Sequence, residues 1–526
     1  MTNKNTSIFT KLGIASFIMM SSVFTSRVIG LGREMAIAYA GGAGGSVDAY
    51  QISFLIPEIL NHIVASGFLS VTFIPIFSAW LAKEQEDEGW KIFSIIFNSF
   101  SIILLVFIAI SMIFAPILVK ILAPGFHDPV LFNKAVRMTR IIIPAQFFFF
   151  SGGLFMAVQF AKEKFLIPAL APLLYNLFTI IFGLALNSLM GIEGFAWGVL
   201  TGAFTGNFLL QYFGAKKIGL KIYPIINIKH PEFIKYLLLT LPLMLGLTMV
   251  FSTELLLKYF GSFLAEGSIA AMNYGLRIMY IMVGLFGQAV GMASYPFMSR
   301  LAAEHKINDL NRLLNKTLKF LLLVIPVSVL LMVLRHEIVL ILFKRGKFGL
   351  QATEITAEVL PFILTGTFAY AAQTLVVRAY YSIQNTWLPT VFSTIVVLIS
   401  LPMFYILMNL MGIRGIALAL SITATAQVSC LFKFWNLKTL NTQGKDVYIF
   451  FVKILAITVG IGAILWTVEY ILHSFINTSS IACALLVCII TGIIFLMLLA
   501  CAGLIFKIEE ISFMTRKIKN KILFCK

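Results

Sequence analysis

Residues 390–413 read TVFSTIVVLISLPMFYILMNLMGI, and no Asp, Glu, Lys or Arg occurs between positions 379 and 413. The stretches 92–119, 166–192 and 278–299 lack these charged residues in the same way. A helix of about 20 residues crosses a hydrocarbon core of about 30 Å, so each stretch is long enough to span a bilayer. Lipid offers the backbone no hydrogen-bond partner, so these stretches are predicted to be transmembrane helices.

The composition of the whole chain also indicates that most of its surface lies in lipid. Of 526 residues, 60% are hydrophobic and 12% are charged, whereas an ordinary soluble protein is about 25% charged. The predicted fold is therefore an all-α polytopic membrane protein with about fourteen transmembrane helices. We expect these helices at 8–40, 46–82, 91–119, 130–161, 166–188, 193–215, 233–260, 267–303, 309–344, 352–383, 387–411, 414–437, 447–473 and 479–507.

The formal net charge of +18 is concentrated in the short connections between these helices. Basic residues there orient a membrane protein and contact anionic lipid, so we expect membrane lipids and not nucleic acid as partners. The basic clusters at 216–235, 300–319 and 516–521 fall on one side if both termini are cytoplasmic, although the cluster at 335–347 falls on the other. The apolar run near the N-terminus is interpreted as the first helix and not as a removed signal peptide.

An internal repeat with an offset of 221 residues divides the chain. The matches are Pro75 and Pro296, Gly125 and Gly346, Pro168 and Pro389, and the hexapeptides LMGIEG at 189–194 and LMGIRG at 410–415. The repeat predicts an N-terminal six-helix lobe at 8–228 and a C-terminal six-helix lobe at 229–445. Because six is even, both lobes enter the membrane from the same side, as in transporters built from parallel repeats. Two additional helices at 446–507 and a basic cytoplasmic tail at 508–526 follow.

Charged side chains inside the predicted spans are the candidate functional residues, because each costs about 2.5–3.5 kcal/mol to insert and tends to face a cavity. They are Arg27, Arg33 and Glu34 in the first span, Asp48 and Glu58 in the second, Glu254 in the seventh, Arg277 in the eighth and Arg378 in the tenth. The planar arginine fork donates two parallel hydrogen bonds to a phosphate. Arginines that converge from both lobes are therefore predicted to bind a pyrophosphate.

Structural roles are the alternative for several of these residues. Arg33 and Glu34 would form a structural ion pair, or Arg33 would snorkel, if they lay near a membrane interface. Arg378 lies near the cytoplasmic end of its predicted helix. Glu254 is followed one turn later by Lys258, a spacing that suits an ion pair as well as it suits a role in ion coupling.

No pattern in the chain predicts catalysis. The six histidines show no metal-ligand spacing, and the five cysteines lie mostly in apolar helices without metal or disulfide spacing. We therefore expect no enzyme activity, no metal and no cofactor. Because no nucleotide-binding motif is present, transport would be driven by the membrane potential or an ion gradient. The oligomeric state is left open, and the sequence is compatible with a monomer.

The stretch SRVIGLGRE at 26–34 resembles the first-helix signature of the MurJ (MviN) family of lipid II flippases, which belongs to the multidrug/oligosaccharidyl-lipid/polysaccharide exporter superfamily. Weaker similarities follow in order along the chain, up to about residue 440. They are Asp48-Ala49-Tyr50 with Ile56-Pro57, Phe73-Ile74-Pro75, Ala123-Pro124-Gly125-Phe126, Arg277-Ile278-Met279, Leu342-Phe343 with Gly346 and Phe348, and Tyr380-Tyr381 with Asn385-Thr386 and Pro389.

The resemblance implies a lipid II flippase of the bacterial inner membrane, active in peptidoglycan and cell-wall biogenesis by alternating access. Its substrate would be the undecaprenyl-pyrophosphate-linked peptidoglycan precursor. Arg27, Arg33 and Arg277 would line a central cationic cavity, and Asp48 would add a carboxylate. Glu34 stands where the family usually has aspartate, which keeps the charge. The two helices after the repeat would form a groove for the lipid tail.

The chain departs from the family pattern in its second helix. Asn61 and His62 stand where the family usually has basic residues, and Ser66 stands where it usually has an acidic residue. His62 could still donate a hydrogen bond to phosphate. The departure leaves the headgroup open, so the alternative is a flippase for another polyprenyl-linked precursor, of the O-antigen or capsule type. A membrane glycosyltransferase is disfavoured, because the longest connections are short and mixed or mostly basic.

Overall fold

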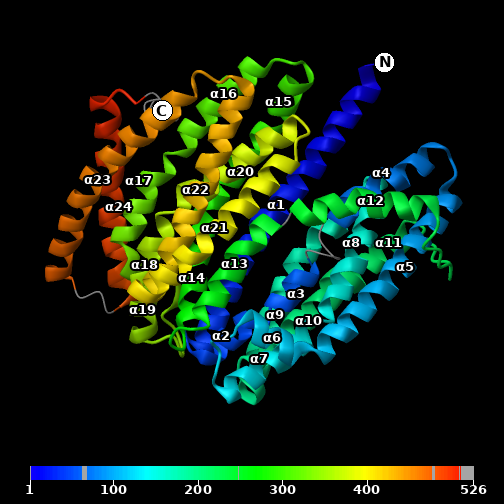
Figure 1. The fold of residues 1–526 in the computed structure, drawn as a ribbon, viewed down its shortest axis with the longest axis horizontal. Coiled ribbons are helices and arrows are strands. Elements are labelled where there is room, and N and C mark those ends of the chain that lie inside the picture. Colours follow the sequence, from blue (N-terminus) through cyan, green and yellow to red (C-terminus); the bar gives the residue numbers. More distant parts are fainter. Residues whose placement is uncertain (1, 62–67, 247, 477–479, 509, 511–526) are drawn as a thin grey trace. The chain divides into compact units, whose positions relative to one another are not determined.

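The computed structural model describes residues 2–61, 68–246, 248–476, 480–508 and 510. Within these residues every regular element is a helix (Figure 1). This arrangement confirms the all-α fold class expected from the uncharged stretches.

The first half of the sequence forms the helices up to residue 217. They are α1 (Thr2–Gly41), α2 (Gly45–Ile52), α3 (Leu55–Leu60), α4 (Phe68–Ala82), α5 (Glu86–Ile113), α6 (Ala115–Leu122), α7 (Pro129–Ile142), α8 (Ala145–Ala161), α9 (Leu166–Met190), α10 (Glu193–Gly202), the π-helix η2 (Ala203–Leu209) and α11 (Leu210–Lys217).

The second half forms the helices from residue 231 onward. They are α12 (Pro231–Gly246), α13 (Thr248–Gly261), α14 (Ser268–Met282), the π-helix η3 (Val283–Gln288), α15 (Ala289–Ala303), α16 (Ile307–Leu321), α17 (Val324–Val333), α18 (Arg335–Phe343), α19 (Leu350–Leu364), α20 (Thr367–Ser382), α21 (Trp387–Met411), α22 (Ile413–Thr439), α23 (Gly444–Phe475) and α24 (Ile481–Ile505).

Nine helices among the described residues are long and apolar enough to cross a membrane, and the pair α19–α20, bent by 44°, makes a tenth. Four further spans were expected, at 8–40, 46–82, 193–215 and 233–260. Two of these spans, 46–82 and 233–260, contain residues outside the described part of the chain, namely 62–67 and 247. Within the span 193–215, α10 passes into the π-helix η2. The expected total of about fourteen therefore stays a prediction.

The 221-residue repeat recurs in the backbone. Both α9 and α21 contain 25 residues, and they begin and end 221 positions apart. Four pairs of residues with positive φ keep the same offset, namely Glu84 and His305, Glu163 and Gln384, Gly191 and Gly412, and Gly219 and Leu440. The turns at these four pairs of positions therefore have a positive φ at the same spacing in both halves.

Packing divides the chain into two compact units, 1–270 with 345–348, and 271–344 with 349–526. The first unit includes α12 and α13, which the sequence repeat assigns to the second half. The predicted lobes at 8–228 and 229–445, and the additional segment at 446–507, stay predictions because they rest on the repeat and not on packing. The predicted tail at 508–526 lies outside the described residues, apart from 508 and 510.

Aromatic rings form much of the core in the first unit. The ring of Tyr236 on α12 lies 6.4 Å from Phe73 on α4 and 5.5 Å from Phe100 on α5, measured between centroids. All three side chains are buried. Edge-to-face contacts of this kind add about 0.5–1.5 kcal/mol beyond burial. They fix α12 against α4 and α5.

The second unit is built around buried aromatic residues whose polar atoms are satisfied. The indole of Trp435 donates to Asn311 Oδ1 at 2.8 Å, and the hydroxyl of Tyr380 donates to the carbonyl of Leu431 at 2.9 Å. The two rings meet edge to face at 5.1 Å. Such pairing lets large polar-tipped side chains be buried without an unsatisfied donor.

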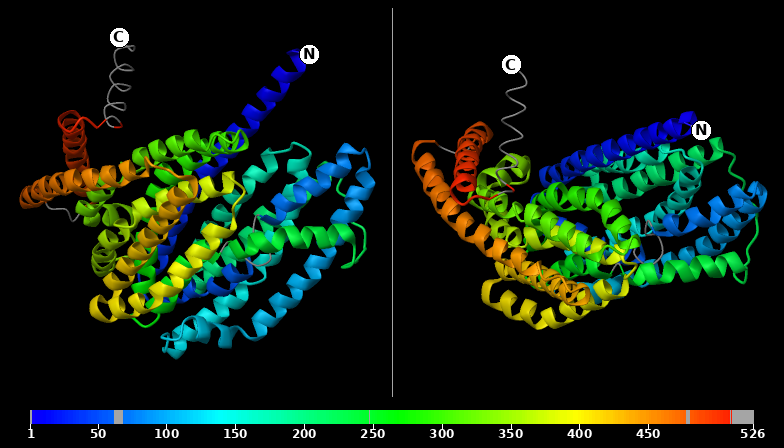
Figure 2. Two further views of the ribbon diagram at one scale, coloured as in Figure 1. Left: turned by 45° about the horizontal axis from the view of Figure 1, so that its top comes forward. Right: turned by 90° about the horizontal axis from the view of Figure 1, so that it is seen from above.

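The last two helices, α23 and α24, lie side by side in both views of Figure 2 and pack against α17. In their most apolar windows only 28% of α23 and 22% of α24 is buried. Hydrophobic faces of this size are stable only in an apolar solvent. The two helices therefore present most of their surface to lipid.

Candidate functional site

Arg33 on α1 is held in place by two partners from different helices. Its Nη2 donates to Glu34 Oε1 at 2.8 Å, and its Nη1 donates to Asn176 Oδ1 of α9 at 3.2 Å. The guanidinium also lies 6.0 Å from the ring centroid of Tyr175. The side chain keeps 19% of its surface exposed, whereas Glu34 is buried at 3%. The planar fork is therefore pre-oriented while one side stays accessible.

Asn176 organises the contact between α1 and α9. Its side-chain nitrogen lies 3.3 Å from Ser26 Oγ and donates to the carbonyl of Pro172 at 3.0 Å. One turn away along α1, the Ser22 hydroxyl donates to the carbonyl of Ala169. α1 runs without interruption through Gly30 and Gly32.

Arg27 lies six residues before Arg33 on the same helix and is exposed. Six residues correspond to about 1.7 turns, so the two side chains leave the helix about 120° apart around its axis. The first unit therefore carries two arginines along one helix. One of them is fixed by the Glu34 ion pair, the structural alternative foreseen for Arg33.

Asp48 on α2 caps the start of another helix. Its carboxylate accepts hydrogen bonds from the backbone N–H of Gly267 at 2.5 Å and of Ala270 at 2.7 Å. Helices leave their first N–H groups without partners, and Gly267 has no side chain with which to cap α14. Gly267 has φ +88°, and a Cβ there would lie 2.2 Å from the Ala43 carbonyl oxygen. Asp48, 2% exposed, thus supplies the missing cap.

A charge cluster around one buried lysine joins α3 to α13. Lys258, 1% exposed, lies 3.1 Å from Glu58 Oε2 and 3.6 Å from Glu254 Oε2. The pairing of Glu254 with Lys258 confirms the one-turn contact that their spacing suggested. Glu58 was expected only as an intramembrane carboxylate. Its partner lies 200 positions away and was not predictable from spacing.

The other residues that the sequence marked as candidates lie outside the clusters described above. Arg277 on α14 and Arg378 on α20 are partly buried members of the second unit. Their convergence with Arg27 and Arg33 stays a prediction. Asn61 follows the last residue of α3, and its backbone N–H bonds to the carbonyls at the end of that helix. His62 lies outside the described residues.

An apolar cavity of about 320 Å³ opens on the second unit. Its walls come from α17, α18, α19 and α23, and its lining residues are Val329, Met332, Val333, Arg335, Pro361, Gly462, Ala463 and Trp466. Arg335 is the one charged residue among them. A hydrocarbon chain fits such a lining, with a polar group near the arginine.

Sequence reasoning missed a cluster of Glu337, Glu469 and His473 in the second unit. The expectation that no metal binds rested on the spacing between histidines. The available signal was different, because Glu469 and His473 lie four residues apart near the end of a largely apolar helix and therefore share one face. Asn176 was missed because an isolated asparagine in an apolar helix has no recognisable pattern.

Comparison with known proteins places the chain in one family. The family model described as lipid II flippase MurJ matches residues 37–487. A Buchnera aphidicola (subsp. Baizongia pistaciae) protein named probable lipid II flippase MurJ is 29% identical over 427 residues, which are 80% of this chain and 83% of that protein. A Burkholderia cenocepacia protein named lipid II flippase MurJ is 26% identical over 415 residues, 77% of this chain and 80% of that one.

Solved structures agree with this placement. The structure titled "Lipid II flippase MurJ, inward closed conformation" matches with a TM-score of 0.73 and 25% identity, and covers 93% of this chain and 99% of that chain. An inward-facing MATE family transporter of the MOP superfamily matches with a TM-score of 0.66 and 13% identity, covering 79% of this chain and 94% of that one, which shows a shared fold. This chain, a multi-pass membrane protein, belongs to the lipid II flippase MurJ family.

Proposed function

We propose that this protein moves lipid II, the undecaprenyl-pyrophosphate-linked peptidoglycan precursor, across the bacterial inner membrane. The observation that carries the proposal is the family match over residues 37–487. The arginines of α1 are the residues of this chain that suit the substrate. The fixed fork of Arg33 and the exposed Arg27 suit a pyrophosphate, because a guanidinium donates two parallel hydrogen bonds to an oxyanion and stays charged at any physiological pH.

The roles of the individual residues follow from their surroundings. Arg27, Arg33 and Arg277 bind the phosphates in this proposal, with Glu34 and Asn176 as positioning residues for Arg33. Asn176 and Glu34 occupy Nη1 and Nη2, and the buried Nε of Arg33 has no hydrogen-bond partner among the described residues. A buried donor without a partner costs about 1–3 kcal/mol, so a phosphate oxygen that accepts from it would be favoured.

The cavity on the second unit supports a separate site for the polyprenyl tail. It is lined by α23, one of the two helices that follow the repeat, and its walls are apolar except for Arg335. In this proposal the tail stays in lipid and in this groove while the headgroup crosses. The protein then works by alternating access, without a chemical reaction.

The topology and the driving force complete the proposal. Both termini are placed in the cytoplasm, because most basic connections then lie on the cytoplasmic side. The membrane potential or an ion gradient drives net movement, with no cofactor. A charge that crosses the membrane gains about 2.3 kcal/mol per 100 mV, which is enough to bias a transport cycle. Asn61 and His62 are the positions at which this chain would differ from its family in headgroup preference.

The direct test is depletion of the protein in its own host, followed by an assay of lipid II on the outer leaflet. We expect less exposed lipid II, accumulation inside and lysis. Normal exposure with normal growth would contradict the proposal and would indicate another polyprenyl-linked glycan.

A second test concerns the arginines. Arg27→Ala or Arg277→Ala is expected to abolish lipid II exposure without loss of protein from the membrane. Arg277→Lys should be partly defective, because it keeps the charge but loses the fork. The matched control is Arg312→Ala, which removes an exposed arginine of α16. Full activity of both alanine variants would exclude a phosphate site at these arginines.

A further inference from the structure

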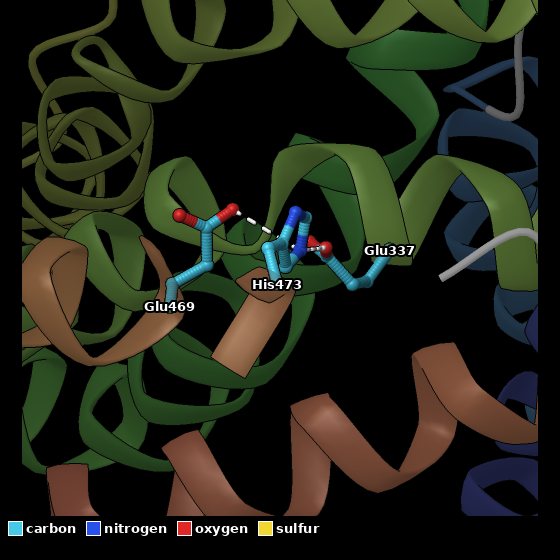
Figure 3. Close-up of side chains that lie close together, drawn as sticks. All are labelled: Glu337, Glu469 and His473. Atoms are coloured by element: carbon cyan, nitrogen blue, oxygen red, sulfur yellow. Dashed lines mark hydrogen bonds and ion pairs between the residues drawn. The ribbon is translucent and has the colours of Figure 1, made fainter. Parts of the chain in front are cut away.

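Three titratable side chains meet where α18 faces α23. Glu337 lies in the first turn of α18, and Glu469 and His473 project from the same face of α23 (Figure 3). His473 Nε2 lies 2.6 Å from Glu337 Oε1 and 3.4 Å from Glu469 Oε1. One ligand atom from each residue lies within 4.8 Å of the other two.

Glu337 is buried more deeply than a carboxylate normally is. It is 1% exposed, and Glu469 is 14% exposed. The second oxygen of Glu337, Oε2, is buried and has no hydrogen-bond partner among the described residues. An ionised carboxylate removed from water is stable only if it is paired and hydrogen-bonded. One of its two oxygens therefore still lacks a partner.

The local charges do not balance through His473 alone. A protonated imidazole supplies one positive charge against two carboxylates. Arg335, the next cation on α18, donates through Nη1 to the carbonyl of Met332 at 3.3 Å and forms no ion pair with either carboxylate among the described residues. A divalent cation would balance both carboxylates while His473 stays neutral.

We propose that Glu337, Glu469 and His473 bind one divalent transition-metal ion, with Zn²⁺ as the best match. Zn²⁺ takes imidazole nitrogen and carboxylate oxygen ligands at about 2.0–2.2 Å in tetrahedral geometry, which separates neighbouring ligand atoms by about 3.4 Å. The atoms of His473 and Glu469 already have this separation. Rotation of the His473 ring, 33% exposed, opens the shorter distance to Glu337, and water completes the coordination.

The ligand set favours this class of ion over Mg²⁺ or Ca²⁺. Those hard cations prefer oxygen ligands alone and take six or more, whereas an imidazole beside two carboxylates suits Zn²⁺ and its neighbours in the first transition row. The ion would link α18 to α23, one of the two helices that follow the repeat. It would also fix one end of the apolar cavity, because Arg335 and Trp466 lie close in sequence to the ligands.

The test uses the purified full-length protein in detergent, incubated with Zn²⁺ and then dialysed against metal-free buffer. Elemental analysis is expected to find one Zn²⁺ per wild-type chain, and Zn²⁺ but not Mg²⁺ should raise the melting temperature. His473→Gln and Glu469→Gln should each weaken Zn²⁺ binding by at least about tenfold, since even outer-shell changes cost 10- to 100-fold. His127→Gln, at an exposed histidine in the connection before α7, is the control that keeps the metal.

Two results would overturn the proposal. A wild-type protein that retains no Zn²⁺ would show that the cluster is an imidazole–carboxylate hydrogen-bond group only. Equal Zn²⁺ retention in the wild type and in both variants would place the ion elsewhere on the chain. Glu337→Gln would not decide the question, because Glu337 is buried and a folding defect in this variant could also cause loss of the metal. The measurement does not depend on lipid II transport, so it stands apart from the proposed function.

Discussion

Replacement of Asp48 by alanine is expected to destabilise the start of α14 strongly. The change leaves the buried N–H groups of Gly267 and Ala270 without the acceptors that now lie at 2.5 and 2.7 Å. Each orphaned buried donor costs about 1–3 kcal/mol. Removal of the buried carboxylate also removes its own desolvation cost, which offsets part of the loss. The expected net destabilisation is about 2–4 kcal/mol.

The assay is the apparent melting temperature of the purified protein in detergent, measured beside lipid II exposure in cells. The matched control is Asp128→Ala, which removes an exposed cap whose carboxylate accepts from the backbone N–H of Leu131 at 2.8 Å. An ordinary cap of this kind contributes about 1 kcal/mol. Asp48→Ala should therefore melt at a clearly lower temperature than Asp128→Ala.

Asp48→Asn provides the sharper comparison. The amide keeps one acceptor oxygen but turns an N–H₂ group toward the second backbone donor, so it should lie between wild type and alanine in stability. The reasoning would be refuted if Asp48→Ala had the same melting temperature as the wild type while lipid II exposure was lost. The carboxylate would then act on the substrate, the role that the family resemblance implied, and not as a helix cap.

Three other changes test the rest of the described site. Asn176→Leu should reduce lipid II exposure at normal protein levels, because Arg33 loses the acceptor that orients its fork. Lys258→Met should destabilise the protein by about 1–3 kcal/mol in thermal melting, because it leaves two partly buried carboxylates without their cation, and adding Glu58→Gln should restore part of that loss. Gly415→Ala should lower the amount of folded protein in the membrane, because a Cβ there would lie 1.8 Å from the Leu407 carbonyl oxygen.

The controls for these changes come from the same helices or the same residue types. Gly460→Ala on α23 adds a methyl group with no heavy atom within 4 Å and should be tolerated. Asn176→Ser keeps a hydrogen-bonding side chain and should retain more activity than Asn176→Leu. An Asn176→Leu protein with full activity would show that Arg33 needs no partner on α9. A Lys258→Met protein as stable as wild type would show that the carboxylates are neutral without the lysine.

Local sequence patterns were sufficient to predict the fold class. Uncharged stretches longer than a bilayer span identify helices regardless of their tertiary contacts, because lipid imposes the same requirement on each one. The hexapeptides around Gly191 and Gly412 identified the repeat, and the backbone shows why they are alike. Both glycines end a helix with a positive φ, 60° and 57°, which glycine adopts without strain.

Partnerships between distant residues were not predictable in the same way. Arg33 and Glu34 are neighbours in sequence, so their ion pair could be foreseen as an alternative. Asp48 bonds to a residue 219 positions away, and His473 contacts one 136 positions away. Sequence spacing carries information only along one helix, whereas these contacts depend on how separate helices pack. Charge inside a span thus marked Asp48 as important without showing what it does.

The four pairs of residues with positive φ, each 221 positions apart, also bear on how the gene evolved. From Glu84 to Gly219 and from His305 to Leu440 the two halves have kept the same length, while most of their side chains have diverged. A single residue inserted within a helix would turn the remainder of that helix by about 100°, moving its buried face into lipid. After duplication, selection would therefore have tolerated substitutions far more readily than insertions or deletions. Homologous positions in the two halves can be aligned across this region by counting alone.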